Sequence, residues 1–248
     1  MKLTVLGSGS SANGYILHNG TEALIIECGC PVQDALRALD FNTKKVVGCI
    51  ISHVHGDHFK YIEDYLQYFP CYCSQGTINS KKDWKTMRRP NVLVNLKTVS
   101  LGNFSIRPSD VKHDAPEPFG FIIKHPEIGT LIFATDTYYI KYKFDDLTKI
   151  MIECNYDLDI LKDNVCNGSV HHKLEERTLQ SHMSLEHCKS MLKSNDLSGV
   201  TDIVLLHLSA NNSEPDRFKK EIEQLTGIPT TIAKKGLEMP FNKNPFIL

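Results

Sequence analysis

Apolar residues occur mostly in short alternating or continuous runs along this chain, a pattern that is typical of β-strands. The run at residues 46–51 is almost continuously apolar and rich in β-branched side chains, so it predicts a strand that is buried on both faces. Residues 15–17 and 23–26 predict a hairpin. We expect further strands at residues 2–6, 71–73, 92–94, 104–108, 120–124, 130–134, 150–153 and 203–207.

Helical spacing of apolar residues separates these strands. It predicts helices at residues 31–39, 58–69, 184–193 and 214–225. Residues 155–182 are polar and rich in charge, and they predict an irregular surface arm or lid. Strands with helices between them, followed by a second strand–helix half, predict the α/β class. Two sheets packed face to face with helices outside would fit this order.

Composition narrows the picture. The chain has 248 residues, 41% of them hydrophobic, which suffices for one sizeable core. Its formal net charge is −1, without the basic surplus that proteins gripping long nucleic acids usually carry. We find no secretion signal and no apolar run of about 18 residues, so we expect a cytoplasmic protein without a membrane span. The eight cysteines are therefore expected to be reduced.

The chemistry is concentrated directly after the buried strand at 46–51. His53, His55, Asp57 and His58 follow it within six residues. In an extended segment His53 and His55 point the same way, so both can reach one metal ion. Asp57 and His58 lie at a predicted helix start and can turn toward a second ion. Imidazole and carboxylate groups suit zinc, manganese or iron.

Three more candidate ligands follow the ends of other predicted strands. His113 follows the strand at 104–108, Asp136 follows the strand at 130–134, and His207 ends the strand at 203–207. Two metal ions need roughly four protein groups each, some of them shared. Because polar residues at the ends of buried strands often carry chemistry, we expect these three to complete the site.

The motif His-x-His-x-Asp-His, then a lone His, a strand-ending Asp and a late His, resembles the metallo-β-lactamase superfamily in order and over nearly the whole chain. The resemblance implies a four-layer αββα sandwich, a single domain over residues 1–248, and two divalent metal ions, most often Zn²⁺ with Mn²⁺ as the alternative. One ion would be held by His53, His55 and His113, the other by Asp57, His58 and His207, with Asp136 bridging both. The loop at residues 7–14 also resembles the family's first loop, whereas Glu27 stands where the family usually has an aspartate.

The segments at residues 152–156, 181–184 and 206–209 resemble the phosphodiesterase branch, which includes ribonuclease Z and the YycJ/WalJ nucleases. In that branch His182 would be the general acid and Glu153 its partner, while Asp57 would orient the nucleophile or take its proton. Ser184 also predicts a helix cap next to His182. A glyoxalase II type thioesterase stays open as an alternative, as does a metal-binding interaction protein without catalysis, because a fold alone does not select a reaction.

Two substrates remain within the phosphodiesterase branch. Only 22 residues separate His113 from Asp136, which leaves no room there for the long arm of transfer-RNA processing enzymes. The segments at 113–118 and 208–212 are similar to YycJ-like DNA exonucleases. The compact length and the segment at 134–143 are similar to phage anti-Pycsar phosphodiesterases, which degrade cyclic CMP and cyclic UMP to evade antiviral defence.

We favour the cyclic mononucleotides, with cyclic AMP and cyclic GMP included, because the chain has no basic surplus. The location would then be the host cytoplasm if the chain comes from a phage. We expect substrate contacts from Tyr138, Lys141, Ser209 and Asn211. The basic stretch at 171–177 would touch substrate, reach into a partner's site, or lie in solvent. We expect a homodimer, the commonest oligomer.

Overall fold

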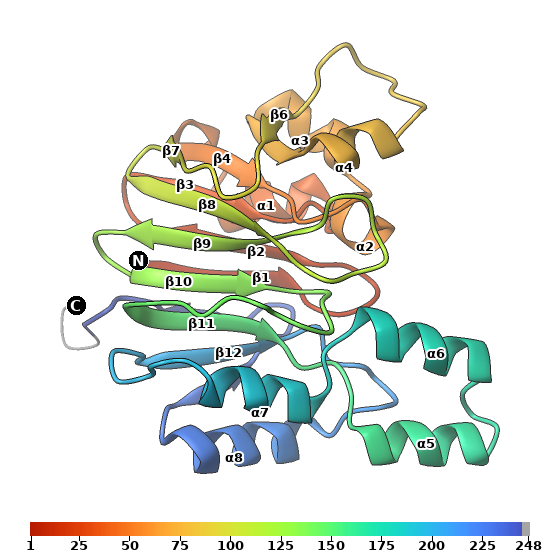
Figure 1. Cartoon of the computed structure of the whole chain (residues 1–248). Coiled ribbons are helices and arrows are strands. Elements are labelled where there is room, and N and C mark those ends of the chain that lie inside the picture. The colour runs from red at the N-terminus through yellow and green to blue at the C-terminus, as the bar shows by residue number, and fades with distance from the viewer. Residues whose placement is uncertain (245–248) are drawn as a thin grey trace.

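Two seven-stranded sheets organise the chain in the computed structural model, which describes residues 1–244 (Figure 1). The first sheet has the order β14 (Glu238–Pro240), β1 (Lys2–Gly7), β2 (Gly14–His18), β3 (Ala23–Ile26), β4 (Val46–Ile50), β5 (Cys71–Ser74) and β6 (Asn91–Leu93). The second has the order β13 (Thr230–Ile232), β12 (Asp202–Leu206), β11 (Leu147–Glu153), β10 (Gly129–Ala134), β9 (Phe119–His125), β8 (Phe104–Asp110) and β7 (Val99–Leu101).

Eight α-helices lie in the described residues: α1 (Val32–Ala38), α2 (Gly56–Phe59), α3 (Ile62–Tyr68), α4 (Gln75–Ser80), α5 (Leu158–Cys166), α6 (His172–Ser181), α7 (Leu185–Lys193) and α8 (Pro215–Thr226). A short 3₁₀ helix (Thr43–Lys45) precedes β4. Helices α5 and α6 project together at the end of the molecule away from both termini (Figure 1). Within residues 1–244, no helix combines the length and apolarity that a bilayer-spanning segment needs.

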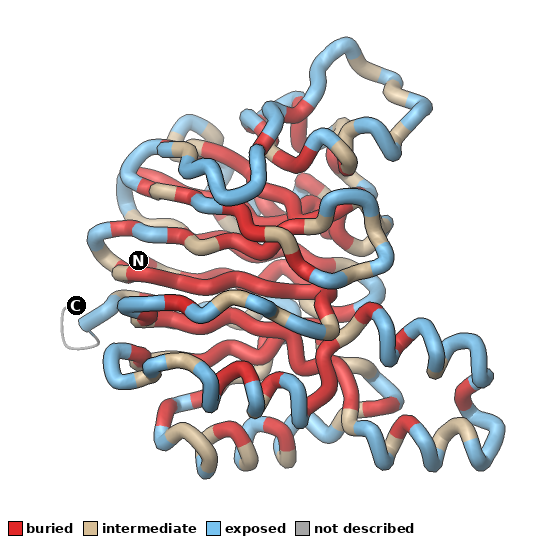
Figure 2. The backbone as a smooth tube through the Cα atoms, in the orientation of Figure 1, coloured by how far each residue is buried: buried red, intermediate tan, exposed pale blue. Residues whose placement is uncertain are grey.

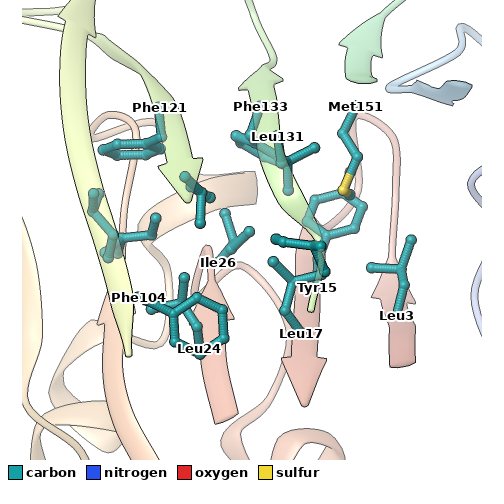
Figure 3. Close-up of a cluster of buried hydrophobic side chains, with 14 of the residues drawn as sticks. Leu3, Tyr15, Leu17, Leu24, Ile26, Phe104, Phe121, Leu131, Phe133 and Met151 are labelled. Carbon is teal, nitrogen blue, oxygen red and sulfur yellow. The ribbon is translucent and has the colours of Figure 1, made fainter. Parts of the chain in front are cut away.

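Alternation along the strands builds separate hydrophobic layers. In β2, Tyr15 and Leu17 point into the core between the two sheets, whereas Ile16 packs on the other face with α1 and α3. Figure 3 shows the layer between the sheets, where Leu24 and Ile26 of the first sheet meet Phe104 and Phe121 of the second. Fully burying a side chain of this size contributes roughly 1.5–3 kcal/mol.

A third layer covers the outer face of the second sheet. Ile203 and Leu205 of β12 pack there against Leu192 of α7 and Phe218 of α8. The order helix, sheet, sheet, helix confirms the predicted αββα sandwich, and Figure 2 shows that buried residues concentrate along the strands of both sheets. The single-domain assignment over 1–248 stays a prediction, and residues 245–248 lie outside the described range.

The sheet topology brings several strand ends to one edge. Strands β3, β4 and β5 run parallel in the first sheet, and β10, β11 and β12 run parallel in the second. The residues that follow three of these strands, Glu27, Asp136 and His207, have positive φ angles of 68°, 47° and 54°. A non-glycine residue in this region costs on the order of 1–3 kcal/mol, and such strain clusters at functional sites.

Two predicted segments differ from the structure. The helix expected at 58–69 is divided into α2 and α3. The segment at 155–182, expected to be irregular, contains α5 and α6, so that prediction is wrong. The Asp157 side chain caps α5 by accepting hydrogen bonds from the backbone of Asp159 and Ile160, and His171 caps α6. Because these helices bury few side chains, their apolar pattern is weak in the sequence.

The predicted state of the cysteines agrees with the structure. All eight lie in the described residues as free thiols, and only Cys166 is exposed.

Candidate metal centre

Seven predicted ligands come together at this edge of the sandwich. One group of ligand atoms within 4.8 Å of one another comes from His53, His55, His113 and Asp136, and a second comes from Asp57, His58, Asp136 and His207. Asp136 belongs to both groups. Its Oδ2 lies 3.8 Å from His53 Nε2 and 3.7 Å from His113 Nε2, whereas its Oδ1 lies 3.3 Å from His58 Nε2 and 3.5 Å from His207 Nδ1. Each carboxylate oxygen therefore faces one group.

The first group has the character of a metal site. The rings of His53, His55 and His113 have centroids 4.6–4.9 Å apart. His53 Nδ1 lies 2.8 Å from Ser52 Oγ, which leaves Nε2 to face the group. That Nε2 atom is buried and has no hydrogen-bond partner among the described residues. Since an unpaired buried nitrogen costs free energy, a cation bound there would satisfy it, and this donor set fits a divalent metal.

In the second group, neighbouring side chains favour the charged forms of Asp57 and His58. Burial would raise the pKa of Asp57, but hydrogen bonds with His207 and His58 outweigh burial and hold that pKa below its usual range. Burial would lower the pKa of His58, yet the carboxylates of Asp136 and Glu27 raise it well above its usual value. In the first group, burial of His53 and the neighbouring His58 outweigh the Asp136 carboxylate and lower the pKa of His53 well below its usual value.

Glu27 directly follows β3, at the position where the superfamily that the sequence resembles usually has an aspartate. Its side chain is completely buried, and its carboxylate accepts hydrogen bonds from the backbone N–H of Ser52 at 3.3 Å. Its Oε2 also lies 3.5 Å from His58 Nδ1. The longer side chain thus supports both the start of the His53–His58 run and the ring of His58, as expected of a residue that orients a metal ligand.

Asn13 is a site residue that the sequence analysis did not single out. It is completely buried, and its Nδ2 lies 3.1 Å from Asp57 Oδ2 and 3.0 Å from His58 Nε2. Its backbone N–H donates to the carbonyl of Asp57 at 2.7 Å. The small-residue loop at 7–14 was the available signal, because such a loop lets the backbone approach other chain segments closely.

Gly29 lets the backbone of α2 approach the first sheet. A Cβ atom at this position would lie 1.7 Å from the carbonyl oxygen of Asp57. The same residue donates its N–H to the carbonyl of Asn13 at 3.0 Å. Any side chain here would displace the backbone that carries Asp57 and His58.

We therefore expect Gly29→Ala to reduce both stability and metal binding. Overpacking against rigid backbone typically costs about 1–3 kcal/mol, and the displaced backbone carries two candidate ligands. Thermal denaturation and metal content of the purified protein measure the two effects. Gly20→Ala is the matched control, because a Cβ at Gly20 meets nothing within 4 Å. Equal behaviour of the two variants would contradict this steric account.

Glu153 and His182 form a pair beside the second ligand group. Glu153 Oε1 lies 2.6 Å from His182 Nδ1, and its Oε2 accepts hydrogen bonds from the backbone of Thr137 and Met183. Burial would lower the pKa of His182, but the Glu153 carboxylate outweighs burial and raises it. The side chain of Ser184 caps α7, as predicted, by accepting from the backbone of His187 at 3.1 Å. Ser184 therefore caps α7 while the ring of the nearby His182 stays bound to Glu153.

The ligand groups open onto a pocket of about 370 Å³. One wall contains His55, Asp57, Asp136, His182 and His207; a second contains Ser169, Val170, Leu174, Arg177 and Thr178 of the α5–α6 arm; the rest includes Ser10, Asn155 and residues 208–212. Two of the four predicted substrate contacts, Ser209 and Asn211, lie in this lining.

Tyr138 and Lys141 do not line the pocket at the ligand groups. They line a separate pocket of about 290 Å³ against α7. Lys141 Nζ donates to Asp110 Oδ2 at 2.6 Å, so its charge is already paired. The segment after Asp136 turns toward α7, and a sequence pattern does not encode that direction. Their predicted role as contacts of the substrate at the ligand groups has no support in this arrangement.

Comparisons with known proteins agree with this fold. The family described as anti-Pycsar protein Apyc1 matches residues 1–79, which contain the small-residue loop and the His53–His58 run. Exodeoxyribonuclease WalJ of Streptococcus pneumoniae is 24% identical over 233 residues, covering 86% of this chain and 83% of WalJ.

Solved structures extend the likeness to the whole chain. The metallo-β-lactamase fold protein YhfI from Bacillus subtilis has a TM-score of 0.72 at 20% identity, covering 96% of this chain and 98% of YhfI. Zn²⁺-bound PqqB from Methylobacterium extorquens has a TM-score of 0.72 at 13% identity, covering 97% of this chain and 100% of PqqB. The chain therefore has the metallo-β-lactamase fold, with two groups of candidate metal ligands at one edge of its sheets.

Proposed function

We propose that this chain is a dinuclear metal-dependent phosphodiesterase that opens cyclic mononucleotides to linear monophosphates, with cyclic CMP and cyclic UMP as its first candidates. The metal ions are proposed to be Zn²⁺, with Mn²⁺ as the alternative. The similarity of residues 1–79 to the anti-Pycsar family supports removal of a cyclic-nucleotide signal in antiviral defence, hence action in the cytoplasm of an infected host.

The observation that carries the proposal is the pocket at the ligand groups. Its volume of about 370 Å³ lies at the lower end of the range for small-molecule sites, about 300–1,000 Å³. Arg177 is the one Lys or Arg residue in its lining, all of which falls within residues 1–244. Proteins that hold long nucleic acids neutralise many phosphates, and each neutralised phosphate needs a cation. One cation in a small pocket suits a substrate with one phosphate.

The chain's own residues divide the reaction between them. Bound divalent cations would lower the pKa of a coordinated water and offset charge on the phosphate oxygens. Asp57, on the pocket wall, can orient the attacking water or take its proton. His182, on the same wall and held by Glu153, can donate a proton to the leaving ribose oxygen. Glu153 keeps the ring of His182 in place through three hydrogen bonds of its own carboxylate.

A WalJ-like DNA exonuclease is the second candidate, favoured by the 24% identity with WalJ across 86% of this chain. It requires a strand to enter the pocket end-first, since the arm and the loop at 208–212 flank the ligand groups. It also requires phosphate contacts beyond Arg177.

A side-by-side assay of the metal-loaded protein decides between these functions. The substrates are cyclic CMP, cyclic UMP, cyclic AMP, cyclic GMP, linear duplex DNA, bis-p-nitrophenyl phosphate and a glutathione thioester. We expect linear monophosphates from the cyclic nucleotides, intact DNA, an intact thioester, and loss of activity after chelation. The rate should change little between about 50 and 200 mM salt, whereas binding of DNA through 6–10 phosphates would fall by about 10³–10⁵.

Other outcomes assign the chain elsewhere. Degraded DNA beside intact cyclic nucleotides would make it a WalJ-like nuclease, and thioester hydrolysis alone would make it a thioesterase of the glyoxalase II type. Metal binding without hydrolysis of any substrate would favour the remaining alternative, a metal-binding interaction protein without catalysis. Sedimentation of the same sample tests the proposed homodimer.

A further inference from the structure

The α5–α6 arm is tied to the first ligand group at two points. Arg177 Nε donates to Asp114 Oδ2 at 3.0 Å, and Asp114 directly follows the candidate ligand His113. The backbone carbonyl of Ser181, at the end of α6, lies 2.9 Å from His113 Nδ1. The position of the arm is therefore linked to the position of a candidate metal ligand.

The Arg177–Asp114 pair is too exposed to serve mainly as a structural contact. The Arg177 side chain is 56% exposed and that of Asp114 is 41% exposed. Ion pairs of this kind contribute little to stability because water competes for both partners. The pair nevertheless fixes the direction of a guanidinium group that lines the pocket.

Arg177 also keeps unused hydrogen-bond donors. Its Nε is bound to Asp114, whereas Nη1 and Nη2 have no hydrogen-bond partner among residues 1–244. A planar guanidinium held at one nitrogen can present the others to two oxygens of a phosphate. Around it the arm contributes Val170, Leu174 and Thr178, which offer an apolar and hydroxyl surface next to the cation.

From this geometry we infer that Arg177, aligned by Asp114, binds the substrate phosphate and so determines the preference of the site for anionic esters. Asp114 is a positioning residue that acts through Arg177. This inference deepens the proposed phosphodiesterase and rests on it for the substrate, but it also makes a claim about binding of phosphate alone.

The test compares Arg177→Gln and Arg177→Lys in the metal-loaded full chain. Arg107→Gln is the matched control, since Arg107 is an exposed arginine that lines a different pocket on β8. A lost charge-assisted hydrogen bond predicts a roughly 10- to 100-fold rise in KM for bis-p-nitrophenyl phosphate, with kcat changed much less. Lysine should recover part of the loss. The inhibition constant or calorimetric Kd of inorganic phosphate should rise by a similar factor.

Asp114→Asn tests the positioning role. It should raise KM by less than Arg177→Gln does, and the double variant should be no worse than Arg177→Gln alone, because both changes act on one contact. Metal content and melting temperature should match wild type in the Arg177 variants. A fall in metal content there would indicate instead that the arm only supports His113.

Unchanged KM and unchanged phosphate affinity in Arg177→Gln would overturn the inference. Its failure is separable from failure of the proposed function. If cyclic nucleotides are not hydrolysed but Arg177→Gln still weakens phosphate binding, the phosphate site stands and the substrate assignment falls. If cyclic nucleotides are hydrolysed equally by Arg177→Gln and wild type, the function stands and the phosphate site falls.

Discussion

Asp136→Asn is expected to abolish hydrolysis, with a loss of at least roughly 10³-fold in kcat/KM, and to lower the metal content of the protein. Asp136 is the one residue shared by both ligand groups, and each of its oxygens faces a different group. An amide keeps the shape of the side chain but carries no negative charge. The asparagine side chain has one oxygen where aspartate has two, so one of the two ligand groups loses an oxygen ligand.

The choice of asparagine rather than alanine follows from the backbone. Asp136 has a φ of 47°, a conformation that asparagine tolerates far better than alanine does. Asp146→Asn is the matched control, because Asp146 is exposed and has a φ of 57°. Metal analysis, activity and melting temperature are measured for both. Full activity in Asp136→Asn would show that the two groups do not need a shared carboxylate.

The hydrophobic pattern predicted most strands of the sandwich, because a strand that is buried on both faces needs apolar residues at nearly every position. The run at 46–51 forms β4, at the centre of one helix–sheet core, and residues 203–207 form β12 except for His207, the residue with positive φ. Short edge strands are different. The strand β14 pairs with β1 across more than 230 residues of chain, and its three-residue sequence, Glu-Met-Pro, is too short to carry a local signal of that pairing.

The sequence could predict those site residues whose side chains can themselves bind a metal ion. Histidine and aspartate at strand ends marked all seven candidate ligands, because few other side chains suit a divalent metal. Asn13 and Gly29 were missed because their importance lies in what they touch, the backbone and side chain of Asp57, and not in their own chemistry. Tyr138 and Lys141 were chosen for their nearness in sequence to Asp136, but the chain turns away from the ligand groups after that residue.

His182→Ala is expected to slow hydrolysis of cyclic nucleotides by roughly 10²–10⁴-fold while metal content stays unchanged. His182 lines the pocket and is held by Glu153 at 2.6 Å. It lies outside the two groups of seven predicted ligands, although its ring also comes within 4.8 Å of Asp136, Glu153 and His207, so unchanged metal content is the check that it is not a ligand. Its loss should leave the fold intact, because Glu153 keeps its hydrogen bonds from the backbone of Thr137 and Met183. A change in rate then reports on proton donation.

The leaving group separates proton donation from other roles of His182. A ribose oxygen leaves as a poor alkoxide unless it is protonated, whereas p-nitrophenolate leaves readily without a proton. The loss in His182→Ala should therefore be large for cyclic CMP and much smaller for bis-p-nitrophenyl phosphate. His187→Ala on α7, an exposed histidine, is the control and should leave both rates unchanged. Equal losses on both substrates would assign His182 to positioning of the substrate or of the ligand groups, because a general acid acts only where the leaving oxygen needs its proton.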